Sequence, residues 1–118
     1  MNINIDYKSR KSIYEQIVDN IENYVSLGIL KEDEQIPSIR EMAIKLGVNP
    51  NTVKKAYDIL DSKGIIKTFS TKGTFISNNI NAVRDKKIEK EITIIKEKIN
   101  ELTKLGLSLK EIYEKIKL

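Results

Sequence analysis

The sequence contains neither cysteine nor histidine. Without these residues the chain can form no disulfide, and it lacks thiol nucleophiles, imidazole acid–base groups and the ligands of every common zinc site. Only carboxylates, hydroxyls and lysines are left for catalysis. The acidic residues fall on helix surfaces and in the loop of residues 32–34, where solvation explains them. We therefore expect no enzyme, no cofactor and no metal site.

Proline, glycine and long apolar runs are also scarce. Two prolines and five glycines in 118 residues, with 40% hydrophobic and 32% charged residues, are typical of a mainly helical chain of one domain plus an appendage. No apolar run approaches the roughly 20 residues of a membrane span. The N-terminal sequence MNINIDYKSR lacks the apolar stretch of a signal peptide. We expect a cytoplasmic protein with no membrane partner.

The charge of the chain is mildly basic and unevenly spread. The net charge is +4 and the isoelectric point is about 9.2. Residues 1–48 carry a net charge of −2, whereas residues 49–83 and 84–118 carry +3 each. A basic excess that begins at residue 49 favours an anionic partner, although a solvated surface explains the sum about as well.

A first amphipathic helix is predicted near the N-terminus. Apolar residues recur at helical spacing from Ser12 to Leu27, and Gly28 follows where a left-handed residue ends many helices. The next segment, residues 29–36, carries an acidic cluster and is interpreted as a polar connection.

A second, shorter helix is predicted to begin at Ser38. The sequence Ser38-Ile-Arg-Glu41 forms a capping box, in which the Ser38 hydroxyl accepts from the Glu41 amide and the Glu41 side chain reaches back. This helix would run to about Leu46, where Gly47 ends it.

The stretch LGVNPNTVKKAYDIL, residues 46–60, predicts a third helix over residues 50–62. Asn49 is a favoured N-cap, and Pro50 suits the first helical position because its missing N–H costs nothing there. The apolar residues of this helix share one stripe that would face the core: Val53, Ala56, Tyr57 and Leu60. Two short helices around a glycine-containing turn match a helix-turn-helix, whose second helix can enter a major groove.

A β-hairpin is predicted over residues 65–77. In GIIKTFSTKGTFIS, β-branched and aromatic residues flank the turn Ser70-Thr71-Lys72-Gly73. A hairpin in this position, directly after a helix-turn-helix, is a wing.

The remaining residues predict a charged helical tail. Five apolar residues are spaced as the a and d positions of a heptad seam: Ile88, Ile92, Ile95, Ile99 and Leu102. A second capping box at Ser108 opens a last helix, which carries Leu109, Ile112 and Ile116. Because neither helix can bury its stripe alone, we expect these eight residues to form a dimer interface.

Several of these motifs occur together in a known family. IYEQIVDNIENYVSLGIL, IPSIREMAIKLGVNPNTVKKAYDILDSKGII and KGTFIS resemble the winged helix-turn-helix domain of the GntR family of bacterial transcription regulators. The NPNTV sequence and the short C-terminal extension are similar to its YtrA-like branch. The resemblance covers residues 3–78, whereas the tail matches only in length and helical character.

The resemblance implies which residues hold operator DNA. Family members use the P-S-x-R motif, the start of the recognition helix and the wing tip. Carried over to this sequence, the implied contacts are Ser38, Arg40, Asn49, Asn51, Thr52, Lys54, Lys55, Lys72 and Gly73. The wing departs from the family, since Thr71 and Lys72 stand where Gly and Arg are usual. Lysine lacks the fork of arginine, so a phosphate contact is implied at Lys72, whereas contacts to base edges or a narrow groove stay open.

Each implied contact has a structural alternative. Asn49 would cap any helix, and Arg40, Lys54 and Lys55 could be solvated charges. Tyr57 is expected in the core rather than in stacking on a base. The carboxylates at residues 58 and 61 would be repelled by phosphates, which predicts that the first turns of the helix enter the groove and the later turns lean away.

We interpret the chain as mainly α with a small β-hairpin: a winged helix-turn-helix domain over residues 1–79 and a helical dimerisation segment over residues 80–118. It would act as a homodimeric repressor on a pseudo-palindromic double-stranded DNA operator. A small effector at the dimer interface stays open. The alternative is a winged-helix module that binds protein, which the weak net charge favours, and steep salt dependence of binding would separate the two.

Overall fold

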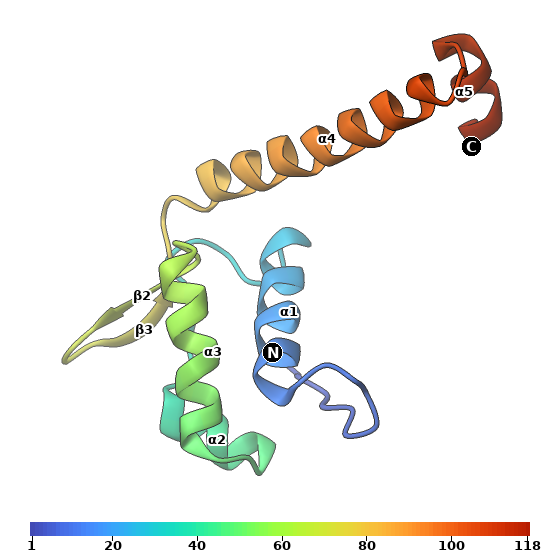
Figure 1. Cartoon of the computed structure of the whole chain (residues 1–118). Helices are drawn as coiled ribbons and strands as arrows, with labels where there is room; N and C mark the ends of the chain where they lie inside the picture. Colours follow the sequence, from blue (N-terminus) through green and yellow to red (C-terminus); the bar gives the residue numbers. More distant parts are fainter. The chain divides into compact units, whose positions relative to one another are not determined.

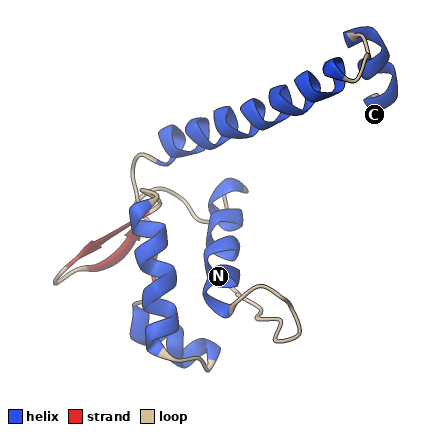
Figure 2. Cartoon of the chain, viewed as in Figure 1, coloured by secondary structure: helices blue, strands red, loops and turns tan.

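The computed structural model describes residues 1–118 and is mainly helical, as the sequence predicts. In chain order the elements are α1 (Ile13–Ser26), β1 (Gln35–Ile36), α2 (Ile39–Leu46), α3 (Pro50–Ser62), β2 (Ile66–Phe69), β3 (Gly73–Ile76), α4 (Ile80–Lys104) and α5 (Leu109–Ile116) (Figure 1; Figure 2). The chain divides into two units, Met1–Val83 and Arg84–Leu118. None of the helices combines the length and the apolar character that crossing a membrane requires.

The helices begin where their capping residues predict. Side-chain oxygens cap four of them, at Ser12, Ser38, Asn49 and Ser108. At Ser38 the structure has the forward half of the predicted capping box, a bond of 3.1 Å from the Glu41 N–H to the serine hydroxyl. Between α2 and α3, Gly47 adopts a left-handed φ of 66°, which lets the chain turn at once into the next helix.

The predicted hairpin is present, but the sheet has a third strand. β3 pairs antiparallel with β2 on one side and with β1 on the other. The prediction that residues 29–36 form only a polar connection is therefore wrong at its end, where Ile36 is buried and lies opposite Thr74. A strand of two residues shows no alternation of polar and apolar residues, so only its partner across the sheet reveals it.

The core of the first unit lies between α1, α2, α3 and the inner face of the sheet. Its largest fully buried hydrophobic side chains come from all of these elements: Ile17, Ile21, Met42, Val53, Leu60, Ile66 and Ile76. The predicted stripe of α3 is buried at each of its four positions, as expected. The first turn of α4 also packs on this core, through Ile80 and Val83.

α1 and α3 pack side by side and run in the same direction. Near their starts, the Lys55 ammonium lies 4.0 Å from the centre of the Tyr14 ring. Near their ends, Lys63 Nζ lies 2.7 Å from Glu22 Oε1. The first turns of both helices are therefore at the same end of the unit, together with the loop that leads into α1 (Figure 1).

The second unit consists of most of α4 followed by α5. Ile112 of α5 is only 3% exposed in the single chain. Ile112 is therefore already buried without a second subunit, and its place in a dimer interface stays a prediction. The turn at Leu105–Gly106, closed by a bond from Leu107 N–H to Leu102 O, lets residues of the same tail cover it. No sequence pattern distinguishes burial within a chain from burial between chains.

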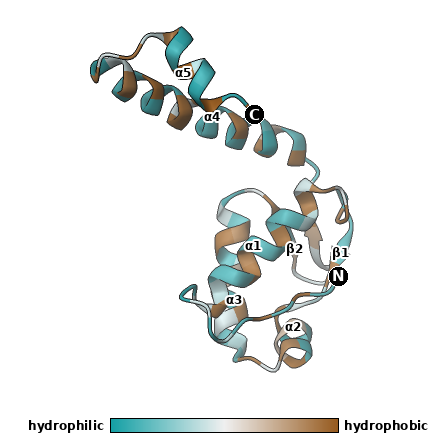
Figure 3. Ribbon diagram, turned by 90° about the vertical axis from the view of Figure 1, so that its right-hand side faces the viewer, coloured by the Kyte–Doolittle hydropathy of each residue, from teal (hydrophilic) through white to brown (hydrophobic).

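Most of the predicted seam on α4 stays uncovered in the single chain. Ile88, Ile92 and Ile95 are 47%, 45% and 52% exposed, respectively. Leu109 and Ile116 of α5 are exposed as well, whereas Ile99 and Leu102 are half-buried. Apolar residues recur along both helices as brown segments in Figure 3. A row of exposed isoleucines on a helix is unusual for a protein that stays monomeric in water.

Candidate nucleic-acid interface

The start of α3 is polar and exposed, whereas its remainder is fixed to the core. The Asn49 carboxamide oxygen accepts the Asn51 N–H at 2.8 Å, so Asn49 is occupied as the cap. The Asn51 side chain is exposed, and Thr52 is half-buried. Behind them, Val53, Ala56 and Leu60 are fully buried. The first turn of α3 is therefore accessible to a binding partner, while the rest of the helix is held in place by the core.

Tyr57 ties α3 to the segment that precedes α2. Its hydroxyl donates a hydrogen bond of 2.6 Å to the carbonyl of Pro37, and its side chain is buried, as predicted. Burial raises the pKa of the Tyr57 phenol, and the carboxylate of Glu41 adds to the rise. The bond holds the residues just before Ser38 and Arg40 against α3, which fixes where α2 begins relative to α3.

The two DNA contacts predicted at the start of α2 differ in whether the side chain already has a partner within the protein. The Ser38 hydroxyl accepts the Glu41 N–H and so serves first as a cap. Arg40 lies in the first turn of α2, and its side chain is exposed. A guanidinium in this place can reach a phosphate in a bidentate manner.

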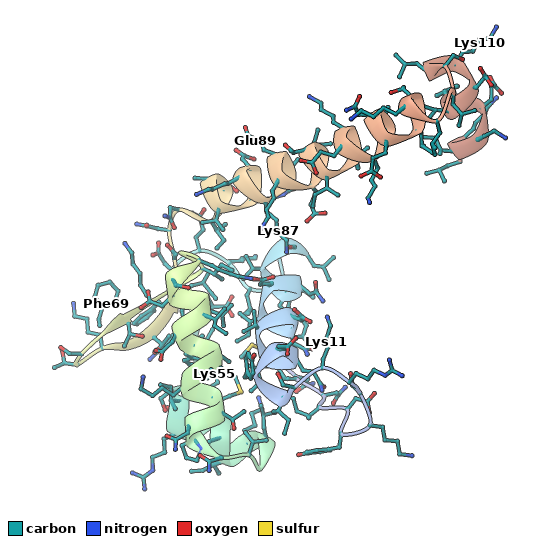
Figure 4. The ribbon with its side chains drawn as sticks, viewed as in Figure 1. Lys11, Lys55, Phe69, Lys87, Glu89 and Lys110 are labelled. Atoms are coloured by element: carbon teal, nitrogen blue, oxygen red, sulfur yellow. The ribbon has the colours of Figure 1, made fainter.

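Both lysines of α3 have partners that were not predicted from the sequence. Lys54 Nζ lies 2.8 Å from Asp58 Oδ2, one helical turn further on. Lys55 projects toward α1 and lies over the ring of Tyr14 (Figure 4). The i,i+4 spacing of Lys54 and Asp58 could have revealed the first pair from sequence. Nothing in the sequence indicates the second, because it joins two helices far apart in the chain.

The wing tip is held by β1. Gln35 Nε2 donates a hydrogen bond of 3.2 Å to the carbonyl of Lys72, and a Cβ placed on Gly73 would lie 2.6 Å from that same nitrogen. Gly73 also has a φ of 112°, which other residues rarely adopt. The structure therefore requires glycine at residue 73 whether or not DNA is bound. The Lys72 side chain is exposed beside it.

The outer face of the hairpin carries an aromatic pair. Phe69 and Phe75 meet edge to face with their ring centres 5.9 Å apart, and Phe69 points into solvent (Figure 4). They border an open depression of about 290 Å³, which Lys67 and Lys72 also line. The chain contains no group of three or more carboxylates placed to hold a metal ion.

Residues 13–76 match the model of the family described as "Bacterial regulatory proteins, gntR family". The transcriptional repressor YtrA of Bacillus subtilis (strain 168) is 39% identical over 119 residues, which cover 98% of this chain and 89% of YtrA. A transcriptional regulator from Oenococcus oeni superposes with a TM-score of 0.77 at 34% identity, over 95% of this chain and 93% of that one. The DNA-binding domain of AraR, solved with operator ORE1, has a TM-score of 0.55 at 25% identity, over 65% of this chain and 94% of AraR's.

Proposed function

This chain belongs to the gntR family of bacterial regulatory proteins, and on that premise we propose that it represses transcription by binding a pseudo-palindromic operator as a homodimer. It is a DNA-binding transcription regulator with a winged helix-turn-helix fold. We assign residues 1–79 to DNA binding and residues 80–118 to dimerisation.

One observation carries the proposal for DNA: α3 exposes a polar first turn and buries the stripe behind it. A helix held in this way can enter a major groove without leaving its own domain. Asn51 and Thr52 then reach base edges, since an Asn carboxamide pairs with adenine N6 and N7 and a Thr offers a hydroxyl and a methyl group. Lys54 contacts a phosphate or a guanine after it releases Asp58, and Lys55 contacts a phosphate.

The remaining predicted contacts fix the position of the protein on the DNA backbone. Arg40 and Lys72 are exposed on α2 and on the wing, on elements that hydrogen bonds attach to α3 and to β1. Their charges suit phosphates, which position a protein without reading sequence. Next to them, the short polar side chains of Ser38 and Asn49 and the backbone of Gly73 also contact the DNA backbone.

The exposed seam of the tail supports the homodimer. Burying the isoleucines of α4 against a second copy removes them from water, which stabilises the assembly by about 25 cal/mol for each Å² of apolar surface buried. A two-fold dimer presents two copies of α3, so we expect an operator with two inverted half-sites. Because the unit after Val83 is small, a site for a small effector belongs at the interface between subunits.

The relative named a repressor supports repression as the outcome of binding. A protein that binds the chromosome of a bacterium works in the cytoplasm, and we place this chain there.

Selection of bound sites from random duplex DNA tests this function directly. We expect an enriched inverted repeat, and binding to it should weaken steeply as salt is added, by about 0.9 in log K per log salt unit for each phosphate contact. If no sequence is enriched and binding to DNA does not depend on salt, the chain is a protein-binding winged helix and the proposal is wrong.

A further inference from the structure

The residues before α1 form an ordered loop that the DNA-binding assignment does not use. A single buried side chain, Gln16, closes this loop with three hydrogen bonds. Its oxygen accepts the Asp6 N–H at 2.8 Å, and its nitrogen donates to the carbonyls of Asp6 and Lys11 at 3.0 Å each. Both ends of the loop, residues 6–11, are thus attached to α1.

Further bonds fix the inside of the loop. The Asp6 carboxylate accepts the Lys8 N–H at 2.9 Å, and the Ser9 hydroxyl accepts the Lys11 N–H at 3.1 Å. The Lys11 ammonium pairs with Asp19 at 2.6 Å. The loop therefore has a defined conformation, and Asp6 and Lys11 are used to maintain it.

What the loop exposes is basic. Lys8 and Arg10 are exposed, and neither is paired with a carboxylate in the structure. Tyr7 beside them is 69% exposed. An ordered loop with two unpaired cations suits an anionic partner, because little conformational entropy is lost when a preorganised loop binds.

The position of the loop identifies the anion. It leads directly into α1, whose first turns lie at the same end of the unit as the first turns of α3. Lys55 of α3 lies over the ring of Tyr14, so a cation of α3 is held against the start of α1, which this loop precedes. In Figure 1 the loop and the hairpin lie on opposite sides of α3. A duplex whose major groove receives α3 has backbone on both sides of that helix.

We propose that the loop of residues 6–11 is a second phosphate-binding element, in which Lys8 and Arg10 hold the DNA backbone on the side of α3 away from the wing. The inference rests on the proposed function, since it requires α3 to lie in a major groove. The protein then contacts the DNA backbone on both sides of α3, through the wing on one side and through the loop on the other. Both cations contact phosphate, so they add affinity for any sequence.

The test compares two charge-matched double variants on the operator obtained by selection and on random DNA. Lys8→Ala/Arg10→Ala removes the two loop cations. Lys110→Ala/Lys117→Ala removes two exposed cations from the second unit and serves as the control. Affinities are measured by fluorescence anisotropy between 50 and 200 mM salt, and thermal melting checks that each variant is folded.

The loop variant should lower the salt slope by about 1.8 per subunit and weaken binding on the order of 10-fold, equally on both DNAs. The control should keep the wild-type slope. The double variant Lys8→Arg/Arg10→Lys keeps both charges and should have the wild-type salt slope.

A folded loop variant with the slope of the control would overturn the inference while leaving the proposed function intact, provided that wild type binds the operator. If binding of the wild-type protein to DNA shows no salt dependence, the proposed function is wrong, and the inference that rests on it is wrong as well. A loss confined to the operator would mean that the loop reads bases, which also contradicts the phosphate role.

Discussion

Replacement of Asp58 by Asn should tighten binding to DNA, because Asp58 competes with phosphate for Lys54. The two side chains are 61% (Lys54) and 64% (Asp58) exposed, with 2.8 Å between Lys54 Nζ and Asp58 Oδ2. In the proposed complex Lys54 leaves this partner or shares it. The carboxylate also adds negative charge to the helix that enters the groove.

The size of the effect follows from the geometry of the pair. An exposed i,i+4 ion pair contributes about 0.3 to 0.5 kcal/mol to a helix. Removing the competition and part of the repulsion should therefore favour the complex by roughly 0.3 to 1 kcal/mol, or about 2- to 5-fold in affinity, since 1.4 kcal/mol is tenfold. The free protein should lose about 0.3 to 0.5 kcal/mol of unfolding free energy, because it loses the pair.

Anisotropy titrations at one fixed salt concentration, on operator and on random DNA, measure the gain, and denaturant unfolding measures the loss. Asp61→Asn is the matched control, since it makes the same charge change on the same helix at an exposed residue outside the Lys54 pair. We expect it to gain less than Asp58→Asn. If Asp58→Asn binds no more tightly than wild type, or if Asp61→Asn gains as much, the competition argument is refuted.

Four further changes test other parts of the structure. Asn51→Ala should cost roughly 1 to 3 kcal/mol on the operator and less on random DNA, and an equal loss on both would mean that Asn51 only positions the helix. Arg40→Ala should weaken binding to both DNAs by similar factors and lower the salt slope by about 1, so an altered sequence preference would argue against a phosphate contact. Ile92→Asp/Ile99→Asp should give monomers in light scattering and weaker operator binding, and a tight dimer would place the interface elsewhere. Tyr57→Phe removes a buried hydrogen bond and should lower unfolding free energy by about 1 kcal/mol in denaturant titrations, whereas an unchanged midpoint would mean that the bond contributes nothing.

The helix-turn-helix could be predicted because its signals are local. A cap such as Asn49 acts on an N–H two residues away, and the spacing of Val53, Ala56 and Leu60 repeats within one helix. Such patterns depend only on neighbours along the chain, so they can be recognised without knowledge of the fold. The DNA contacts carried over from the family stay predictions.

The helices, most of the residues at which they begin, the hairpin and the family could be predicted from the sequence, because each depends on a short-range pattern or on an ordered set of motifs. The contacts between side chains of different elements could not be predicted, and they are known only from the fold. Examples are the pairing of Ile36 with β3, the burial of Ile112 in the single chain, the contact of Lys55 with the Tyr14 ring, and the hydrogen bonds of Gln16 to the loop before α1. These contacts join residues distant in sequence, or residues whose burial depends on how one helix folds back on another. No local period encodes them, because the free energy that selects them belongs to the packed molecule as a whole.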